Sequence, residues 1–528
     1  MILAPAFAYL RQKNQFTVAD QWGAAVAHHD LIYASLLHDA VDGVHFFLPG
    51  GARSDFARPI RELEEEFGAE KVRIQDPMQF PSLITSAEHV ALTGFGGFDG
   101  LQEIREMARR DTFPICSIVH SLPNPQLFTD YYVEALLFGK RHDSIVVTTN
   151  AGRKAMTEIL NGVGEYLRFK LGVDLCPEFE FADIPLGVDE RFLTPRDRIK
   201  CREALALPSC GAIVLYIGRL DEGFKADLEP LLDAFAYVAE KKQDFYLVIA
   251  GREGSGGYGA ALEKRANDLG IGERLRIIRN FSYELKPTIY SAADIFVSPA
   301  DNVQETFGLT LLEAMASELP VIASDWSGYR ELVVHERTGF LIPTFWSVEG
   351  ADWAARLQPP DAGYPESIVA QTTVVNARKL REYLEALASD TELRRRMGEN
   401  GRKRILDRFT WRETISKYSA LWRDQYDRLR HASERQKARP RLSCEVDFSH
   451  FATSSLYPAL RARASSVGHR MIGEWAKGDN DKLRAGACAV LNACAHETRS
   501  IAEITQAVGA DSAQAIPWLL KKGYLLWD

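Results

Sequence analysis

The feature that most constrains the fold of this chain is a regular alternation of short apolar runs with helix-like patterns. The alternation fills the chain up to about residue 195 and then starts again. Strands that alternate with helices are typical of a parallel sheet covered by helices on both faces. The sequence therefore predicts an α/β protein with two Rossmann-like, doubly wound domains, and a ligand crevice at the carboxyl ends of their strands. The expected strands are 2–9, 44–48, 72–74, 89–93, 115–119, 144–148 and 181–184, then 212–217, 245–250, 275–278, 295–297 and 321–323.

The rest of the chain adds helices and a separate unit. Helical patterns include 101–110, 228–241 and most of 376–430, and a polar stretch at 344–375 with Trp346 and Trp353 is expected to be an insertion loop. The segment 431–441 is charged and contains Pro440, which is typical of a linker. A length of 528 residues also favours roughly three domains.

Composition excludes several classes of protein. A net charge of −9 argues against a general nucleic-acid binder. The seven cysteines are scattered and odd in number, as expected for reduced thiols in a cytoplasmic protein. No apolar run approaches the length that spans a bilayer, and the apolar N-terminal run is read as a strand because it lacks the features of a signal peptide.

The segment 305–316 carries a candidate anion site. It follows the apolar run 295–297 and opens an amphipathic helical pattern, so the amides of Phe307, Gly308 and Leu309 would lie at a helix N-terminus. Such an end favours phosphate because its N–H groups lack partners and its dipole is positive. Glu305 and Glu313 would flank the phosphate and accept hydroxyl groups, as a nucleotide sugar requires. The alternative is an ordinary crossover with one solvated and one capping glutamate.

A second motif places two cations beside the first. Gly218 permits a tight turn after the run 212–217, and Arg219 and Lys225 follow at the same end of the strand. Arginine matches phosphate oxygens in a bidentate manner and lysine supplies a point charge. The alternative is a solvated basic pair in a surface loop.

These motifs together resemble the donor half of the family-4 retaining glycosyltransferases of GT-B fold. The resemblance covers about residues 1–430 and is strongest at 210–345. In the first half, the segment 184–189 resembles the family's domain-linking motif, and Val119-His120 resembles the motif of its active-site histidine. In the second half the matching pieces are Gly218-Arg219-Leu220 with Lys225, Ala250-Gly251, Ala293-Asp294-Ile295, Ser298-Pro299, Glu305 with Glu313, and the segments 320–323, 338–341 and 409–411.

The resemblance implies domains and roles. Residues 1–195 would form the acceptor-side domain and 196–404 the donor domain, with a helix at about 405–430 returning to the first. The family would use Arg219 and Lys225 on the donor pyrophosphate, and Glu305 on the sugar hydroxyls. The remaining roles would fall to Phe307, Gly308 and Leu309 at the sugar and phosphate, to Gly218 and Gly251 in the donor-binding loops, to Glu313 at the ribose, and to His120 beside the reacting sugar from the opposite domain.

The chain departs from the family at several positions. Ala226 replaces a preferred glycine, the sequence at 316–319 differs from the usual one, and the loop 11–22 lacks the family's glycine pair. The resemblance therefore does not extend to backbone recognition by that loop. The triad Asp479-Asn480-Asp481 lies outside the catalytic halves, and we expect no metal and no other cofactor.

The unit 442–528 resembles a winged helix-turn-helix. Ser500 and Glu503 form a capping box that opens a short helix, Gly509 turns the chain, and 521–527 reads as a turn and a strand. The candidate recognition helix 511–520 contains no Lys or Arg, which argues against nucleic-acid binding. Docking of a protein partner or of the acceptor is the preferred interpretation.

The sequence thus favours a retaining, metal-independent glycosyltransferase that uses a nucleotide-sugar donor and an acceptor hydroxyl. A sugar-nucleotide epimerase or phosphorylase of the same fold, and a binding protein without turnover, remain as alternatives. The base, the sugar and the acceptor are not revealed.

Overall fold

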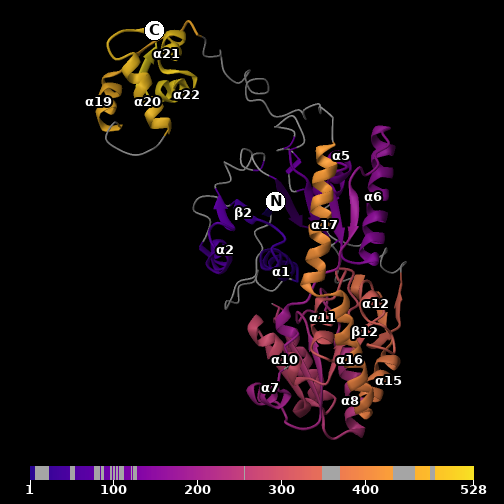
Figure 1. Cartoon of the computed structure of the whole chain (residues 1–528). Coiled ribbons are helices and arrows are strands. Elements are labelled where there is room, and N and C mark those ends of the chain that lie inside the picture. Colours follow the sequence, from indigo (N-terminus) through magenta and orange to yellow (C-terminus); the bar gives the residue numbers. More distant parts are fainter. Residues whose placement is uncertain are drawn as a thin grey trace. The chain divides into compact units, whose positions relative to one another are not determined.

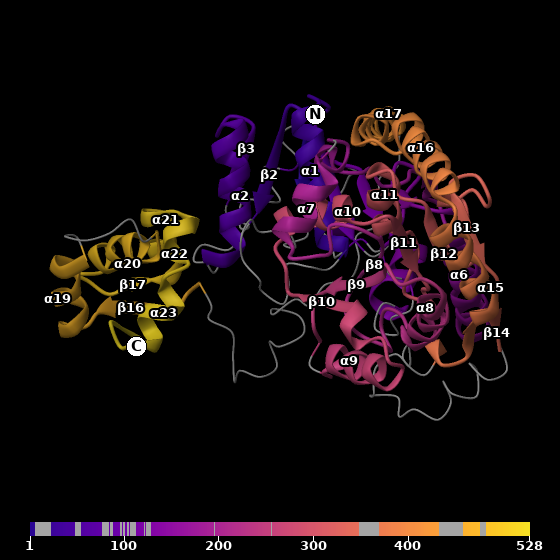
Figure 2. The same cartoon turned by 90° about the horizontal axis from the view of Figure 1, so that it is seen from below.

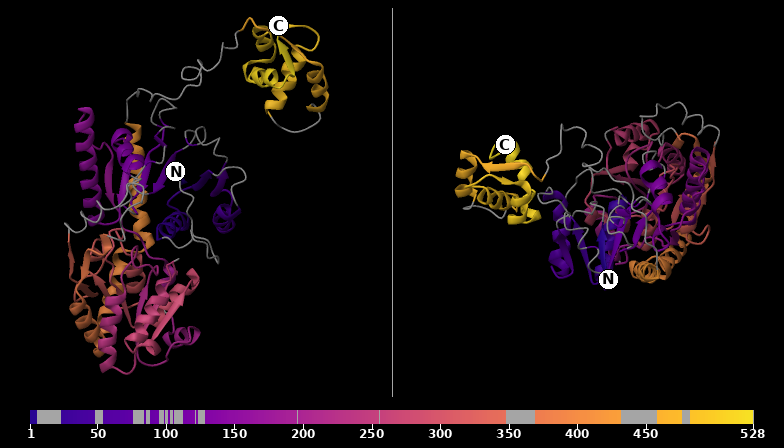
Figure 3. Two further views of the ribbon diagram at one scale, coloured as in Figure 1. Left: turned by 180° about the vertical axis from the view of Figure 1, so that it is seen from behind. Right: turned by 90° about the horizontal axis from the view of Figure 1, so that it is seen from above.

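The computed structural model describes residues 1–5, 23–47, 54–75, 84, 88–94, 98, 101–102, 105, 112–120, 122, 128–194, 196–254, 256–347, 369–431, 458–475 and 482–527. Contacts divide the chain into a unit of residues 1–438 and a unit of residues 439–528. The first unit contains two parallel sheets, which Figure 3 shows as separate bodies coloured indigo to purple and pink to orange. The predicted fold class, two Rossmann-like halves, is confirmed.

The first half is a seven-stranded parallel sheet in the order β3-β2-β1-β4-β5-β6-β7. Its strands bury apolar side chains on both faces, and β4, β5 and β6 are buried at every position, as parallel sheets covered by helices require. The elements are β1 (Ile2–Pro5), α1 (Gly23–Leu37), β2 (Gly43–Phe47), α2 (Ser54–Phe67), β3 (Val72–Gln75), β4 (His89–Gly94), β5 (Ile115–Ile118), η2 (Phe128–Val133), α5 (Glu134–Phe138), β6 (Ser144–Val147), α6 (Asn150–Leu171) and β7 (Glu180–Asp183).

The second half is a six-stranded parallel sheet in the order β10-β9-β8-β11-β12-β13. Its elements are α7 (Arg198–Ala204), β8 (Ala212–Ile217), α8 (Glu229–Lys241), β9 (Phe245–Gly251), α9 (Tyr258–Asp268), β10 (Leu275–Arg279), α10 (Lys286–Ala292), β11 (Ile295–Ser298), α11 (Leu309–Ala316), β12 (Val321–Ser324), α12 (Tyr329–Leu332) and β13 (Gly339–Ile342). All twelve expected strands fall on strands of the two sheets. The thirteenth strand, β13, was not expected as a strand, because the segment 338–341 was identified only as a motif of the resemblance. In each sheet the strand order reverses at one switch point. This point lies between β1 and β4 in the first sheet and between β8 and β11 in the second. Ligand crevices form at such switch points.

Three helices follow the second sheet: α15 (Ala377–Ser389), α16 (Thr391–Arg408) and α17 (Trp411–Arg430), and Figure 2 shows them one after another along one side. In Figure 1, α17 runs along the first half, and its hydrogen bonds explain why. Thr414 donates to the Pro185 carbonyl at 3.3 Å and Gln425 to the Ile115 carbonyl at 3.0 Å. The segment 184–189 meets the start of this helix, since the Val188 amide donates to the Phe409 carbonyl at 2.8 Å.

The expected insertion loop at 344–375 contains regular structure at both ends. Strands β14 (Thr344–Trp346) and β15 (Thr373–Val375) form an antiparallel pair. The loop interpretation is wrong at these positions because the pairing joins residues that are far apart in the sequence, whereas the pattern was read locally. Trp353 and the residues around it lie outside the described ranges.

The second unit has its own core. It contains β16 (Arg461–Ala464), α19 (Ser466–Trp475), α20 (Lys482–Ala493), β17 (Arg499–Ser500), α21 (Ile501–Val508), α22 (Ala510–Ala513), α23 (Ile516–Lys521) and β18 (Leu525–Trp527). The three strands form an antiparallel sheet in the order β17-β16-β18. The predicted capping box is confirmed, since Ser500 and Glu503 each bond the other's backbone N–H. The expected second helix is interrupted, because α22 ends at Ala513 and α23 begins at Ile516, with Pro517 in its first turn. Asp479-Asn480-Asp481 lies outside the described residues.

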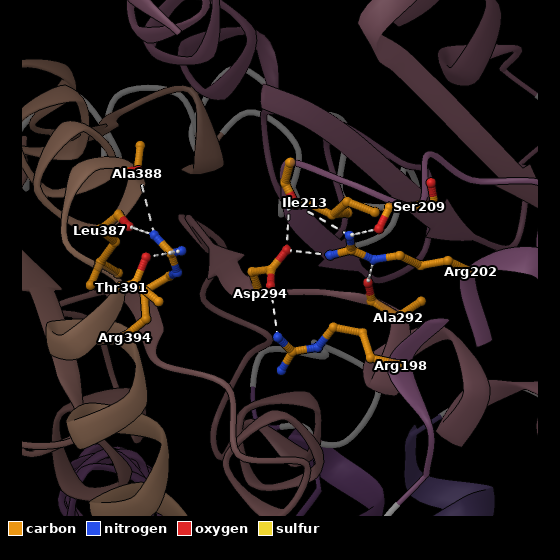
Figure 4. Close-up of polar contacts among 11 residues, drawn as sticks. Arg198, Arg202, Ser209, Ile213, Ala292, Asp294, Leu387, Ala388, Thr391 and Arg394 are labelled. Carbon is orange, nitrogen blue, oxygen red and sulfur yellow. Dashed lines mark hydrogen bonds and ion pairs between the residues drawn. The ribbon is translucent and has the colours of Figure 1, made fainter. Parts of the chain in front are cut away.

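A buried ion pair fastens α7 to the second sheet. Asp294, immediately before β11, accepts from Arg202 at 2.6 Å, from Arg198 at 2.9 Å and from the Ile213 amide at 2.7 Å (Figure 4). The side chains of Asp294 and Arg202 are only 8% and 4% exposed. A buried arginine that loses its carboxylate is costly, because its charge is then neither paired nor hydrated.

We expect Asp294→Ala to lower the free energy of unfolding by about 3–5 kcal/mol, the range observed when one partner of a buried pair is removed. Asp233→Ala is the control, since its pair with Arg265 is 50% and 39% exposed, and it is expected to cost about 1 kcal/mol or less. Urea unfolding of both variants measures the difference. Equal losses would show that the Asp294 pair has no special role.

Candidate active site

The predicted donor residues lie at the switch point of the second sheet. The strands β8 and β11 flank this switch point. Gly218 and Arg219 follow β8, and Glu305 lies in the loop between β11 and α11. Phe307, Gly308 and Leu309 follow in the same loop and open α11. The structure therefore brings these residues to the carboxyl edge of the sheet, where α/β sheets bind ligands.

The centre of this edge is an ion pair between Lys225 Nζ and Glu305 Oε2. The side chains are 23% and 14% exposed, so water screens the pair only in part. Glu305 also accepts from the Phe307 amide at 3.4 Å and from the Tyr329 hydroxyl at 3.5 Å. Burial alone would raise the pKa of Glu305, but the charge of Lys225 and these hydrogen bonds outweigh it and hold the pKa below its ordinary value. The carboxylate therefore stays ionised at neutral pH.

Arg219 lies beside this pair and holds the same loop. One of its guanidinium nitrogens donates to Gln304 Oε1 at 3.1 Å and to the Phe224 carbonyl at 3.2 Å. Arg219 thus bridges the loop after β8 to the loop after β11. The two cations predicted from sequence lie on the same edge.

The glycines of this edge serve close packing. A Cβ on Gly251 would lie 1.8 Å from the Gly218 carbonyl oxygen, and a Cβ on Gly218 would lie 2.4 Å from the Tyr216 hydroxyl. These glycines therefore let the ends of β8 and β9 approach each other. Gly308 has φ +114° at the N-cap of α11, and no side chain caps that helix. Only glycine adopts this backbone readily.

Glu313 is more deeply placed than the sequence suggested. Its side chain is 1% exposed, and it accepts from Lys286 Nζ at 2.5 Å and from the Tyr290 hydroxyl at 2.8 Å. The sequence offered no reason other than a polar ligand for this glutamate to face the sheet, and these partners supply one. Lys286 lies on α10, outside every motif, and no sequence signal pointed to it.

His120 lies just after β5 in the first half, next to the loop between β11 and α11 of the second half. Its Nε2 lies 2.5 Å from Nε2 of His28, which is on α1. Burial lowers the pKa of His120 to about 4, so both rings are neutral at pH 7 and share one proton through this bond. His120 can therefore accept or donate one hydrogen bond but does not supply a positive charge.

Thr306 joins the two halves next to the candidate catalytic residues. Its hydroxyl donates to the His120 carbonyl at 3.2 Å, and its own carbonyl accepts from the Thr149 hydroxyl at 2.8 Å. Thr149 is the N-cap of α6 and also accepts from the Gly152 amide. A threonine at this position is the usual signal for a helix start, but its second bond, across the cleft, cannot be read from sequence.

A second contact between the two halves is made by Glu331 on α12, next to Thr149 at the start of α6. Its two carboxylate oxygens accept from the amides of Asn150 and Ala151, both at 2.9 Å. A carboxylate of the second half therefore occupies the N-terminus of α6 in the first half. A cavity of about 180 Å³ lies beside it and is lined by Leu122, Ala151, Gly152, Ala155, Ile159, Val303, Thr306 and Ser327.

Asp301 is a buried carboxyl in the loop between β11 and α11. One of its oxygens accepts from the Asp227 amide at 3.2 Å, while Oδ1 has no hydrogen-bond partner among the described residues. Burial, followed by the nearby charge of Asp227, raises the pKa of Asp301 to about 7. The residue was not singled out from sequence, because an aspartate after a strand is usually solvated.

Among the described residues, no group of three or more His, Cys, Asp or Glu side chains is arranged to hold a metal ion. In the same part of the chain, no helix is long and apolar enough to cross a membrane.

Sequence comparisons find a family match for part of the second half. Residues 197–356 match the model of the family "Glycosyl transferases group 1". The chain is also similar to D-inositol 3-phosphate glycosyltransferases of Mycobacteroides abscessus (33% identity, covering 31% of this chain and 36% of the relative) and Geodermatophilus obscurus (30% identity, 48% and 49%). A phosphatidyl-myo-inositol mannosyltransferase of Mycobacterium leprae is 32% identical over 32% of this chain and 42% of its own length. The alignments thus span less than half of each of these relatives.

Solved structures share the fold of both halves. Sucrose-phosphate synthase of Thermosynechococcus elongatus has a TM-score of 0.54 at 20% identity, covering 81% of this chain and 99% of its own. HepE of Anabaena, solved with UDP, has a TM-score of 0.53 at 17% identity, covering 80% and 99%. The chain therefore has the GT-B arrangement of two Rossmann-like halves.

The raised pKa of Asp301 gives a pH prediction. Between about pH 4 and pH 7 the folded protein keeps the proton that the unfolded chain has lost, so this residue's contribution to stability falls as pH rises through that window. In Asp301→Asn this part of the pH dependence is absent. We expect the unfolding free energy at pH 5 minus that at pH 8 to be smaller in the variant than in the wild type. Denaturant unfolding at both pH values measures it, with exposed Asp407→Asn as the control, and an unchanged difference would contradict the assignment.

Proposed function

We propose that this protein is a retaining, metal-independent glycosyltransferase that moves a sugar from a nucleotide-sugar donor to an acceptor hydroxyl. The observation that carries the proposal is the pair Lys225–Glu305 with Arg219 at the β8/β11 switch point, across from His120. The family match of residues 197–356 and the UDP in the HepE complex support a nucleotide-sugar donor. UDP-glucose is the first donor to test.

The donor fits this edge by charge. Arg219, Lys225 and the uncapped N-terminus of α11 would hold the pyrophosphate, and Glu305 would contact the sugar hydroxyls. Glu313 is proposed for the ribose, which would require one of its present bonds to Lys286 or Tyr290 to be shared or replaced. Lys225 is already paired with a carboxylate, so donor phosphate would join an existing charge network.

In the proposed reaction the bond between the sugar's anomeric carbon and the diphosphate oxygen breaks. The acceptor oxygen forms its bond on the same face, and its proton passes to the departing diphosphate. Negative charge grows on that diphosphate, and fixed cations in a partly dry site stabilise it. Glu305 is held by Lys225, so its place is beside the sugar hydroxyls rather than at the anomeric carbon. His120, neutral at pH 7, would supply one hydrogen bond to the reacting sugar.

For the unit 439–528 we propose docking of a protein partner or of the acceptor. The helices at 510–521 carry basic residues only at position 521, so they offer little to a phosphate backbone.

We expect Lys225→Ala and Arg219→Ala each to lower turnover by about 10²-fold, because each removes a charge that stabilises the leaving diphosphate. Lys241→Ala is the matched control, since it breaks a lysine–glutamate pair that is 45% and 41% exposed and lies at the last residue of α8. Rates with UDP-glucose and a hydroxyl acceptor measure the effect. Near-normal rates in both site variants would contradict the pyrophosphate assignment.

Activity is expected to survive EDTA, because Arg219 and Lys225 supply the positive charge that a metal would otherwise provide. The measurement is turnover before and after chelation. Complete loss that Mg²⁺ or Mn²⁺ restores would show that a metal takes part.

A further inference from the structure

The surroundings of α6 constrain the acceptor, and the inference rests on the proposed function. The cavity of about 180 Å³ touches Thr306, which follows Glu305, and Leu122, which lies two residues after His120. The cavity is therefore lined by residues next to or near both candidate catalytic residues in the sequence, and Thr306 also bonds the His120 carbonyl. This makes it a candidate place for the acceptor if a sugar sits between His120 and Glu305.

The lining is largely apolar. The side chains of Leu122, Val303, Ala155 and Ile159 contribute only hydrocarbon, and Thr306 has already committed its hydroxyl to His120. An apolar cavity of about 150 Å³ holds one benzene molecule, so this one suits a ring or a short alkyl chain.

The charge beside the cavity opposes an anion. The first amides of α6 would otherwise attract phosphate, but Glu331 occupies the amides of Asn150 and Ala151 with its carboxylate. An acceptor phosphate would have to displace Glu331 and would meet its negative charge. The backbone behind Glu331 is held, since Arg404 donates to the carbonyls of Glu331 and Leu332 at 2.8 and 2.9 Å.

The apolar surface continues along α6, the long helix labelled in Figure 1. Beyond Ala155 and Ile159, the positions Gly162, Tyr166 and Phe169 follow at spacings of three and four, so they share one face of the helix. Tyr166 and Phe169 are 50% and 82% exposed. This face therefore carries two exposed aromatic rings, with Lys170 Nζ 5.8 and 5.7 Å from their centroids, and it fits a ligand whose apolar part is longer than the cavity.

We propose that the acceptor is an uncharged amphiphile, whose hydroxyl is carried on an apolar group that fills this cavity and continues along α6. Glu331 is the specificity-determining residue that excludes acceptors with a phosphate at this position. This acceptor class differs from the inositol 3-phosphate in the names of two relatives.

The test uses the full chain and two matched probes, benzyl alcohol and benzyl phosphate, with dissociation constants from saturation-transfer NMR. In the wild type we expect benzyl phosphate to bind at least about tenfold more weakly than benzyl alcohol, a difference of about 1.4 kcal/mol. Ala155→Phe fills the cavity and should weaken benzyl alcohol by about tenfold or more. Glu158→Phe, at an exposed position of the same helix that does not line the cavity, should have no effect.

Glu331→Gln should strengthen benzyl phosphate, because it removes the negative charge at the α6 N-terminus together with one of the two accepted hydrogen bonds. It should leave benzyl alcohol unchanged, because Glu331 does not line the cavity. Equal binding of both probes to the wild type, or an Ala155→Phe variant that binds benzyl alcohol normally, would overturn the inference. UDP binding is measured in the same samples. Retained UDP binding with failed probe binding contradicts the acceptor class alone, whereas absent UDP binding contradicts the proposed function.

Discussion

The loop between β11 and α11 is held from both sides, and the candidate site depends on that constraint. Asn302, 1% exposed, uses its side-chain oxygen to accept from the Gln304 amide and its backbone carbonyl to accept from Trp326. Its amide nitrogen donates to the Gly223 carbonyl, in the loop after β8. Thr306, four residues on, is bonded to the first half. Glu305 lies between these two attachments, so its position is set by both halves at once.

The Lys225–Glu305 ion pair lies next to the hydrogen bonds that join the two halves. The Lys225–Glu305 pair is formed within the second half, but the next residue, Thr306, contacts the backbone of His120 in the first. Separation of the halves would break the Thr306 and Glu331 bonds and would also release the loop that orients Glu305. A change at this edge can therefore reach the first half through one loop and the N-terminal turn of α6.

Three buried carboxyls in the second half have different surroundings. Asp294 and Arg202 fasten a helix to the sheet and lie away from the carboxyl edge, so their burial serves stability. Lys286 and Glu313 lie at the edge itself, where a stable pair and a ligand contact can use the same carboxylate. Asp301 differs from both, because it lacks a cationic partner and its pKa is raised instead. Burial of a carboxyl thus has three outcomes within one domain, and the available partner decides among them.

The sequence by itself determined the α/β class, the two successive sheets and the residues that gather at the carboxyl edge of the second sheet. These follow from local patterns: apolar periodicity marks strands and helices, and parallel strands place the residues that follow them on one edge. It also determined the capping box at Ser500 and Glu503, because both partners lie within one helical turn. The tertiary structure alone decided what each polar group binds. Lys286 with Glu313, Glu331 with the α6 amides and Thr306 with His120 join positions that are 27, 180 and 186 residues apart. The antiparallel pair β14–β15 was missed for the same reason. A local pattern carries no information on which distant segment will approach, and only the packing of the two halves supplies it.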